Sequence, residues 1–353
     1  MKLLRVRALA AAAAMVAISA VSLQAQAAEN GLQRYSPGIG GSDMTSPLVP
    51  GWYFQTPLVH YHANKLKGND GEAATIGTPV TGYGAAGLAA RTEVKAKATN
   101  IAALPRLTYL SPTQFWGANI GWTAMLPLVK RRVTFEGVAT HLGSNTIAVP
   151  AQYQAGISGL TSKDTGIGDL ELSPLMHWEI GDHQTVTFTP TIVIPTGDYK
   201  ATQRANPGYG NYYTFRPSVQ YAFIGDGWDI GVRNVLSFNT RNKDTGYLSG
   251  KIYNMDFQLM KFVSEDVRFG LQGYFVRQLS ADTYDATRAV YPNTLTPYNL
   301  TDGNKMSVNA VGPALAWLKN GGDMLVEGKV LKEYQARNRF EGTAIWFTVS
   351  KPL

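Results

Sequence analysis

The sequence contains no cysteine, and only 16% of its 353 residues are charged. Without cysteine the chain has no disulfide, no thiolate nucleophile and no thiolate metal site. Beyond the N-terminal leader, no stretch approaches the roughly 18 consecutive apolar residues that indicate a membrane-spanning helix. The mean hydropathy of −0.12 is also too low for a bundle of such helices. Together these absences exclude a multi-helix transporter.

Residues 1–27 have the pattern of a secretory signal peptide. A basic start is followed by an apolar, Ala-rich stretch over 8–23 and by the small-residue site Ala25-Gln26-Ala27. A membrane anchor is the alternative, but the apolar stretch is short for a spanning helix. We therefore expect export, with cleavage near Ala27.

The positive charge of the chain is reduced by this cleavage. The leader carries three of the 32 Lys and Arg residues and none of the 25 Asp and Glu residues, so the net charge falls from +7 to about +4. Such a small excess in an exported protein gives little support to a nucleic-acid partner, and we expect none.

The mature chain is typical of a β-protein. Residues 28–50 are rich in Gly, Ser and Pro and are expected to form an irregular periplasmic lead-in. Residues 51–353 are expected to form one domain, because they divide into about twelve segments in which polar and apolar residues alternate. The segments lie near 52–65, 92–110, 118–135, 167–180, 184–195, 211–224, 228–241, 251–262, 267–279, 304–317, 323–335 and 341–351.

The connections between these segments distinguish a membrane barrel from a soluble sandwich, since both architectures show alternation. Every second connection is short, and the others are mostly much longer. The short ones lie near 111–117, 181–183, 225–227, 263–266 and 318–322, and the others near 66–91, 136–166, 196–210, 242–250, 280–303 and 336–340. Short periplasmic turns, longer extracellular loops and an even strand number indicate an antiparallel transmembrane β-barrel of about 12 strands, with both termini in the periplasm.

Aromatic residues gather beside both sets of connections, as expected at the two interfaces of a bilayer. Prolines resist the assignment, because they lack the donor of the β-ladder and a closed barrel has no edge strand to accommodate them. Seven fall inside expected strands: Pro57, Pro105, Pro127, Pro174, Pro190, Pro217 and Pro313. We expect bulges or kinks at several of these positions.

Three motifs resemble a known family. They are Pro50-Gly51-Trp52-Tyr53, Thr165-Gly166-Ile167-Gly168-Asp169-Leu170, and Pro190 followed by Ile194-Pro195-Thr196-Gly197-Asp198-Tyr199. In these motifs the chain resembles the outer-membrane proteins associated with the meta-pathway of phenol degradation, which are described as transporters. The resemblance covers most of the mature chain. It implies an outer-membrane barrel for uptake of aromatic or other hydrophobic compounds, and it implies no catalytic residue and no cofactor.

The polar face of the strands supplies the candidate lumen lining: Asp169, Glu171, His177, Glu179, Arg216, Asp229, Arg233, Asp256, Arg268, Glu327, Lys329 and Glu333. Charges of both signs inside a barrel set a field for passing solutes, or they pair into a network that plugs a narrow pore. The sequence leaves both alternatives open.

Two other groups of residues have the residue types of a functional site. His60 and His62 lie on one face of a strand with the spacing of a metal pair, but the sequence offers no third ligand. His141, Ser144 and Asn145 are residue types of an acyl-transfer site, yet they lie close together in an expected loop, where a preorganised triad is not expected. We therefore expect no metal and no catalytic residue.

The prediction is an outer-membrane barrel that acts as a passive channel for small hydrophobic or aromatic solutes. Its expected partners are the outer-membrane lipid, the solute and, during biogenesis, the barrel-assembly machinery. Solutes are expected to leave into the periplasm or sideways near the strand prolines. The alternatives are a lipid-acting outer-membrane enzyme with His141 or His177 as base, and an exported soluble β-sandwich that binds a ligand.

Overall fold

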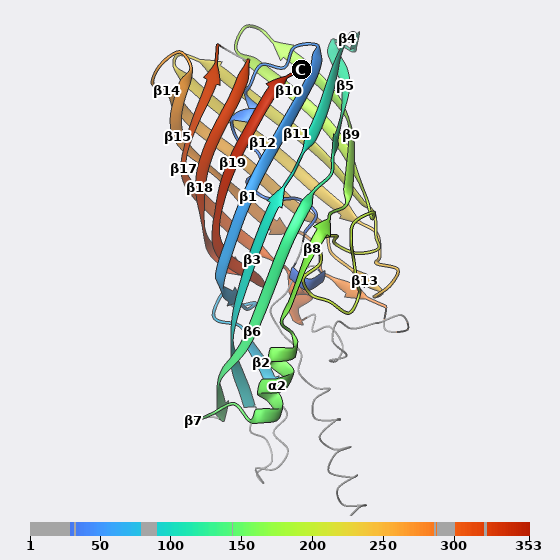
Figure 1. Cartoon of the computed structure of the whole chain (residues 1–353), viewed down its shortest axis with the longest axis vertical. Helices are drawn as coiled ribbons and strands as arrows, with labels where there is room; N and C mark the ends of the chain where they lie inside the picture. Colours follow the sequence, from blue (N-terminus) through green and yellow to red (C-terminus); the bar gives the residue numbers. More distant parts are fainter. Residues whose placement is uncertain are drawn as a thin grey trace, which may run out of the picture.

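A computed structural model of the chain describes residues 29–31, 33–78, 90–142, 144–285, 287, 301–320 and 323–353. The wall of the molecule is a closed antiparallel β-barrel of twelve strands, as the sequence predicts (Figure 1). The expected signal peptide over 1–27 lies outside the described residues. Among the described residues, no helix has the length and apolar character needed to cross a membrane.

Nine wall strands are continuous, and three are each divided into two pieces. The continuous strands are β1 (Gly51–Lys67), β10 (Gln184–Ile194), β11 (Thr214–Gly225), β12 (Trp228–Asn239), β14 (Ile252–Phe262), β15 (Val267–Gln278), β17 (Ser307–Lys319), β18 (Met324–Arg337) and β19 (Arg339–Pro352). The divided strands are β3 (Ala90–Ala103) with β4 (Arg106–Phe115), β5 (Ala118–Met125) with β6 (Leu128–Leu142), and β8 (Ser162–Ile167) with β9 (Leu170–Ile180). Each segment expected from the sequence corresponds to one of these twelve strands.

The barrel is closed by β1 and β19, which pair from Tyr53 with Pro352 to Lys67 with Arg339. Closure leaves no sheet edge along this seam, so the backbone donors and acceptors are satisfied within the wall. The C-terminus and the β4–β5 turn lie at one end of the barrel (Figure 1). At the other end are the short elements β2 (Thr75–Thr78), β7 (Asn145–Ile147), α2 (Ala151–Gly159) and β13 (Tyr247–Leu248), with β16 (Thr283–Tyr284) paired to β13.

One expected loop is partly regular structure. The connection expected over 136–166 contains the end of β6, then β7, α2 and the start of β8. The polar β6 extension alternates without an apolar outer face, which is why the sequence reads as a loop there. This hairpin and helix extend the wall at the loop end.

The wall carries its apolar side chains outward. Leu172, Ile192 and Phe215 are 40 to 48% exposed, although each lies in the middle of the sheet. On the inward face Asp229 and Arg268 are completely buried. This inverted distribution is expected for a barrel whose outer surface contacts lipid.

The expected irregularities at prolines are confirmed in two places. In the first, the divided strands break beside Pro105, Pro127 and Gly168. Backbone hydrogen bonds connect the neighbouring breaks: the Leu126 amide donates to the Pro105 carbonyl, and the Gly168 amide donates to the Pro127 carbonyl. A proline carbonyl still accepts, so each break keeps one connection to its neighbour.

The second irregularity is a row of three prolines on β9, β10 and β11. Pro190 pairs directly with Pro217, and the β9–β10 ladder is interrupted around Pro174 and Pro190. The β11–β12 ladder is likewise interrupted at Pro217. These strands therefore have fewer hydrogen bonds at this level of the wall than elsewhere along their length.

Residues 29–50, described apart from residue 32, form a segment inside the barrel that we call the luminal segment. It contains the short 3-10 turns η1 (Glu29–Gly31) and η2 (Ser42–Met44) and is otherwise irregular. Glu29 contacts Tyr199, Asn242 and Ser249 at the loop end, and β1 begins at the opposite end. The expected periplasmic lead-in is therefore wrong in position, because the buried charges of the wall bind this segment within the lumen.

Candidate functional site

The luminal segment is held in place chiefly by Asp256 on β14. The Asp256 carboxylate accepts hydrogen bonds from the Tyr35 hydroxyl at 2.6 Å, the Gly38 amide at 2.9 Å and the Gly40 amide at 2.8 Å. Gly38 has a φ of +84°, a conformation that glycine adopts without strain. One buried carboxylate thus fixes three successive parts of the segment.

A second anchor lies on β18. Lys329 donates to the Gly40 carbonyl at 2.8 Å, and Glu327 accepts from the Ser42 amide at 2.7 Å. Lys329 and Glu327 also form an ion pair at 3.2 Å. A Cβ on Gly41 would lie within 2.7 Å of both side chains, so a larger residue there would displace these charged groups. Glu327 and Lys329 thus each bind a backbone group of the luminal segment.

The third anchor involves Arg34 and the family motifs. Arg34 pairs with Asp169 at 2.9 Å and donates to the Gly210 carbonyl. Asp169 also accepts from the Gly197 amide at 3.0 Å, while Asp198 accepts from the Ile167 amide at 2.8 Å. The two Gly-Asp motifs therefore meet at the β8–β9 break, where they position the Asp169 carboxylate that binds Arg34 of the luminal segment.

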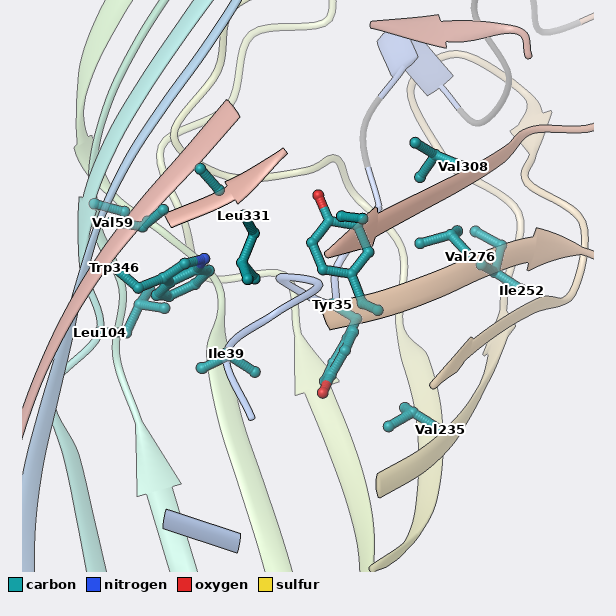
Figure 2. Close-up of a cluster of buried hydrophobic side chains, with 14 of the residues drawn as sticks. Tyr35, Ile39, Val59, Leu104, Val235, Ile252, Val276, Val308, Leu331 and Trp346 are labelled. Atoms are coloured by element: carbon teal, nitrogen blue, oxygen red, sulfur yellow. The ribbon is translucent and has the colours of Figure 1, made fainter. Parts of the chain in front are cut away.

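Apolar contacts add to the polar anchors of the luminal segment. Figure 2 shows Tyr35 and Ile39 between side chains from opposite parts of the wall, with Trp346 on one side and Val235 and Val276 on the other. These residues belong to one buried cluster. The luminal segment thus supplies part of a hydrophobic core inside the barrel, where the wall side chains alone would leave space.

Glu29 ends the described part of the luminal segment at the loop end. It accepts from Asn242 at 2.6 Å and Tyr199 at 3.3 Å. Burial raises the pKa of Glu29 from 4.5 to about 7, although the hydrogen bonds from Asn242, Thr245 and Tyr199 partly offset this effect. The docked segment therefore favours the protonated form of Glu29.

A cavity of about 180 Å³ remains between the luminal segment and strands β4, β5 and β9 to β12. Pro47, Leu48 and Ser350 line it at the end of the barrel where β1 begins. The remaining lining is mixed. It contains serine and threonine side chains of the wall, three arginines, and apolar side chains of the luminal segment and the wall.

The twelve side chains expected to line the lumen occupy the inward face or its rim. Ten are buried, Arg233 is half-buried, and Glu179 is exposed beside the β9–β10 turn. The cavity is lined by four of them: Glu171, His177, Arg216 and Arg233. Most of the others bind the luminal segment or each other, as in the 2.7 Å pair of Arg268 with Asp229. Glu333 instead pairs at 2.8 Å with Arg339, which is not among the twelve. Their part in solute passage stays a prediction.

The sequence prediction missed two groups of residues at this candidate site. The first is the luminal segment itself, whose polar contacts are largely backbone groups and leave no side-chain pattern. The second is Arg106 on β4, which lines the cavity and lies 3.6 Å from Asp43 of the luminal segment. Arg106 follows Pro105, where the strand is divided. The break interrupts the alternation of polar and apolar residues, so the sequence pattern does not show that Arg106 points inward.

The histidine constellations do not assemble into reactive sites among the described residues. His60 and His62 are exposed on the outer face of β1, and no group of three or more His, Cys, Asp or Glu side chains suited to a metal is found in the described ranges. His141 contacts Thr146 at 3.1 Å. His177 contacts Thr187 at 2.8 Å, and no described carboxylate hydrogen-bonds its ring to orient it as a base.

Comparison with solved structures identifies a similar barrel. An outer membrane channel from Pseudomonas putida F1 has a TM-score of 0.64 and 12% identity, covering 91% of this chain and all of that one. The NanC porin, at 10% identity and a TM-score of 0.38, covers 85% of this chain and all of its own. A Pseudomonas aeruginosa FadL homologue, at 8% identity and a TM-score of 0.37, covers 94% of this chain and 97% of its own. At these identities the first likeness shows a shared fold.

No protein with a curated description matches the sequence. The sequence profile of one family matches residues 68–349, which is most of the chain and includes two of the three motifs that suggested the resemblance. The chain therefore belongs to the family described as "Putative MetA-pathway of phenol degradation".

Proposed function

We propose that the protein is a passive channel of the outer membrane that takes up small hydrophobic or aromatic solutes. The observation that carries the proposal is the cavity between the luminal segment and the wall of a barrel with an apolar outer face. The phenol pathway in the family description supports an aromatic solute.

The route follows from the position of the cavity. Solutes enter among the loops, and the luminal segment must shift before they reach the cavity, because its anchors cross the lumen at Asp256 and Lys329. They leave at the end of the barrel where β1 begins, since Leu48 and Ser350 line the cavity there. We prefer this exit to a sideways exit at the proline row, because serine and threonine side chains behind that row would not favour release of an apolar solute into lipid.

Membrane fractionation with heat-modifiable gel mobility tests the location. An outer-membrane protein whose mobility shifts on boiling is expected, since a closed barrel resists detergent until heated. A soluble periplasmic protein without a shift would contradict the proposal and favour a ligand-binding sandwich.

Uptake by whole cells tests the transport activity. Cells lacking the gene, and cells carrying it, are given micromolar radiolabelled toluene, phenol or benzoate, and initial rates are compared. We expect the gene to raise the rate for at least one of the three. Equal rates for all three in both strains, with the folded protein present in the outer membrane, would refute the channel. Hydrolysis of phospholipid by the purified protein would instead revive the enzyme alternative.

A further inference from the structure

The lining of the cavity contains more guanidinium groups than carboxylates. Arg106, Arg216 and Arg233 face it, together with only Asp43 and Glu171. Arg216 and Glu171 form a close pair and neutralise each other. The lining therefore retains one positive charge.

That charge is concentrated where two arginines share one carboxylate. Asp43 of the luminal segment lies 3.1 Å from Arg233 and 3.6 Å from Arg106. Arg233 also donates to the Gln220 side chain at 2.7 and 3.0 Å, so most of its guanidinium already has hydrogen-bond partners. Asp256, the ladder partner of Arg233, does not line the cavity but attracts Arg233 electrostatically, which leaves Arg106 as the less compensated of the two arginines.

Arg106 is less well satisfied. A guanidinium carries five N–H donors and no acceptor, and the 3.6 Å approach to Asp43 is longer than a hydrogen bond. No other described residue hydrogen-bonds the Arg106 side chain, which is 18% exposed toward the cavity. An arginine fork with free donors matches a carboxylate, because the two groups bind through parallel N–H to O contacts.

Apolar side chains lie directly beside these two arginines. Met125 is the cross-strand partner of Arg106, so the two side chains are neighbours on the inward face. Val235 lies two residues from Arg233 on the same face of β12, and Ile39 of the luminal segment also lines the cavity. The cavity thus presents a cationic end and an apolar side to one small molecule.

We propose that this cavity binds the carboxylate of a small aromatic acid, with the Arg106 guanidinium on the carboxylate and the ring against Met125, Val235 and Ile39. The inference rests on the proposed channel function and specifies its solute class. An engineered cavity of about 150 Å³ holds benzene, so 180 Å³ accommodates one ring with its carboxylate. A neutral hydrocarbon fills the same space but leaves the Arg106 donors unpaired, which costs binding free energy.

Calorimetric titration of the purified protein in detergent tests the site, with benzoate and benzamide as probes. The two probes have nearly the same shape, and only benzoate is an anion. We expect benzoate to bind at least tenfold more tightly than benzamide. Added salt should weaken the binding of benzoate but not that of benzamide. Equal affinities of the wild-type protein for the two probes would overturn the proposal without any variant.

Substitution then assigns the site to Arg106. Arg106→Gln should lower the affinity for benzoate at least tenfold and the affinity for benzamide less than threefold. Arg132→Gln is the matched control, because Arg132 is exposed on the outer face of β6 and has no partner among the described residues. Each variant must keep the heat-modifiable shift. A folded Arg106→Gln protein with unchanged benzoate affinity would place the anion elsewhere and refute the assignment.

The binding and uptake results separate the two hypotheses. Uptake of toluene and benzoate at equal rates, without preferential benzoate binding, would keep the channel and reject the acid site. Tight, Arg106-dependent benzoate binding without uptake of any solute would keep the site and reject the channel.

Discussion

Removal of the Asp256 carboxylate is predicted to release the luminal segment and open the barrel. In Asp256→Ala, the Tyr35 hydroxyl and the Gly38 and Gly40 amides lose their acceptor. Hydrogen bonds to a charged group contribute about 1.5 to 3 kcal/mol each. Taking the low end for all three, because water reaches the freed groups, gives about 4.5 kcal/mol. Since 1.4 kcal/mol corresponds to a factor of ten, the undocked population should rise roughly 1,000-fold.

Single-channel recording in planar bilayers measures this release. The wild-type protein should conduct rarely, and Asp256→Ala should open frequently or remain open. Asp323→Ala is the control, because it removes the same group from an exposed turn between β17 and β18. The wall of Asp256→Ala must still show the heat-modifiable shift, which distinguishes an open channel from an unfolded one.

Labelling provides an independent readout, since the natural chain has no cysteine. A cysteine replacing Ser36 on the luminal segment should react faster with a maleimide in the Asp256→Ala background. If conductance and labelling both match those of the wild-type protein, Asp256 does not hold the segment in place, and the reasoning from its three hydrogen bonds fails.

Three further predictions concern pH and the wall. Because the pKa of Glu29 is raised in the docked state, the docking of the luminal segment should be strongest below about pH 4.5, weaken as the pH rises toward 7 and level off above it. The rate at which a cysteine on the luminal segment reacts with maleimide should follow this pH dependence, and Glu29→Gln should abolish it. Identical pH profiles with and without Glu29→Gln would contradict the prediction. Asp229→Ala leaves the buried Arg268 charge unpaired and should lower the free energy of unfolding in urea by about 3 to 5 kcal/mol, whereas adding Arg268→Met should recover much of the loss. Gly168→Ala would bring a Cβ within 2.8 Å of Pro127 and should cost about 1 to 3 kcal/mol in the same assay, while Gly156→Ala, which meets nothing, should not; equal effects would show that the break tolerates a side chain.

The wall was predictable because its rules are local. A strand alternates with period two, and residues such as Leu172 and Ile192 recur on the lipid side wherever the chain crosses the apolar band. The short turns set the strand number. Even the irregularities at Pro105 and Pro127 follow from the missing proline donor.

The interior was less predictable, because its partners are distant in sequence and partly backbone. Asp256 is recognisable as an inward charge, but nothing in the sequence pairs it with amides more than 200 residues earlier. The signal that was available is the number of inward charges. Groups such as Glu327 and Lys329 require partners when buried, and the Gly-rich stretch around Gly38 is the flexible segment able to supply them.

The luminal segment gives the chain an odd number of traverses. Twelve strands alone would place both ends of the barrel domain on one side, but the segment brings Glu29 to the loop end while Leu353 lies beside Trp52 at the other. A tag placed just before Glu29 should therefore be accessible at the cell surface, and a tag after Leu353 only from the periplasm. Residues 29–50 would also reach about 70 Å if fully extended, against an apolar band of about 25 Å. This slack lets the segment shift within the barrel without pulling β1 from its seam with β19.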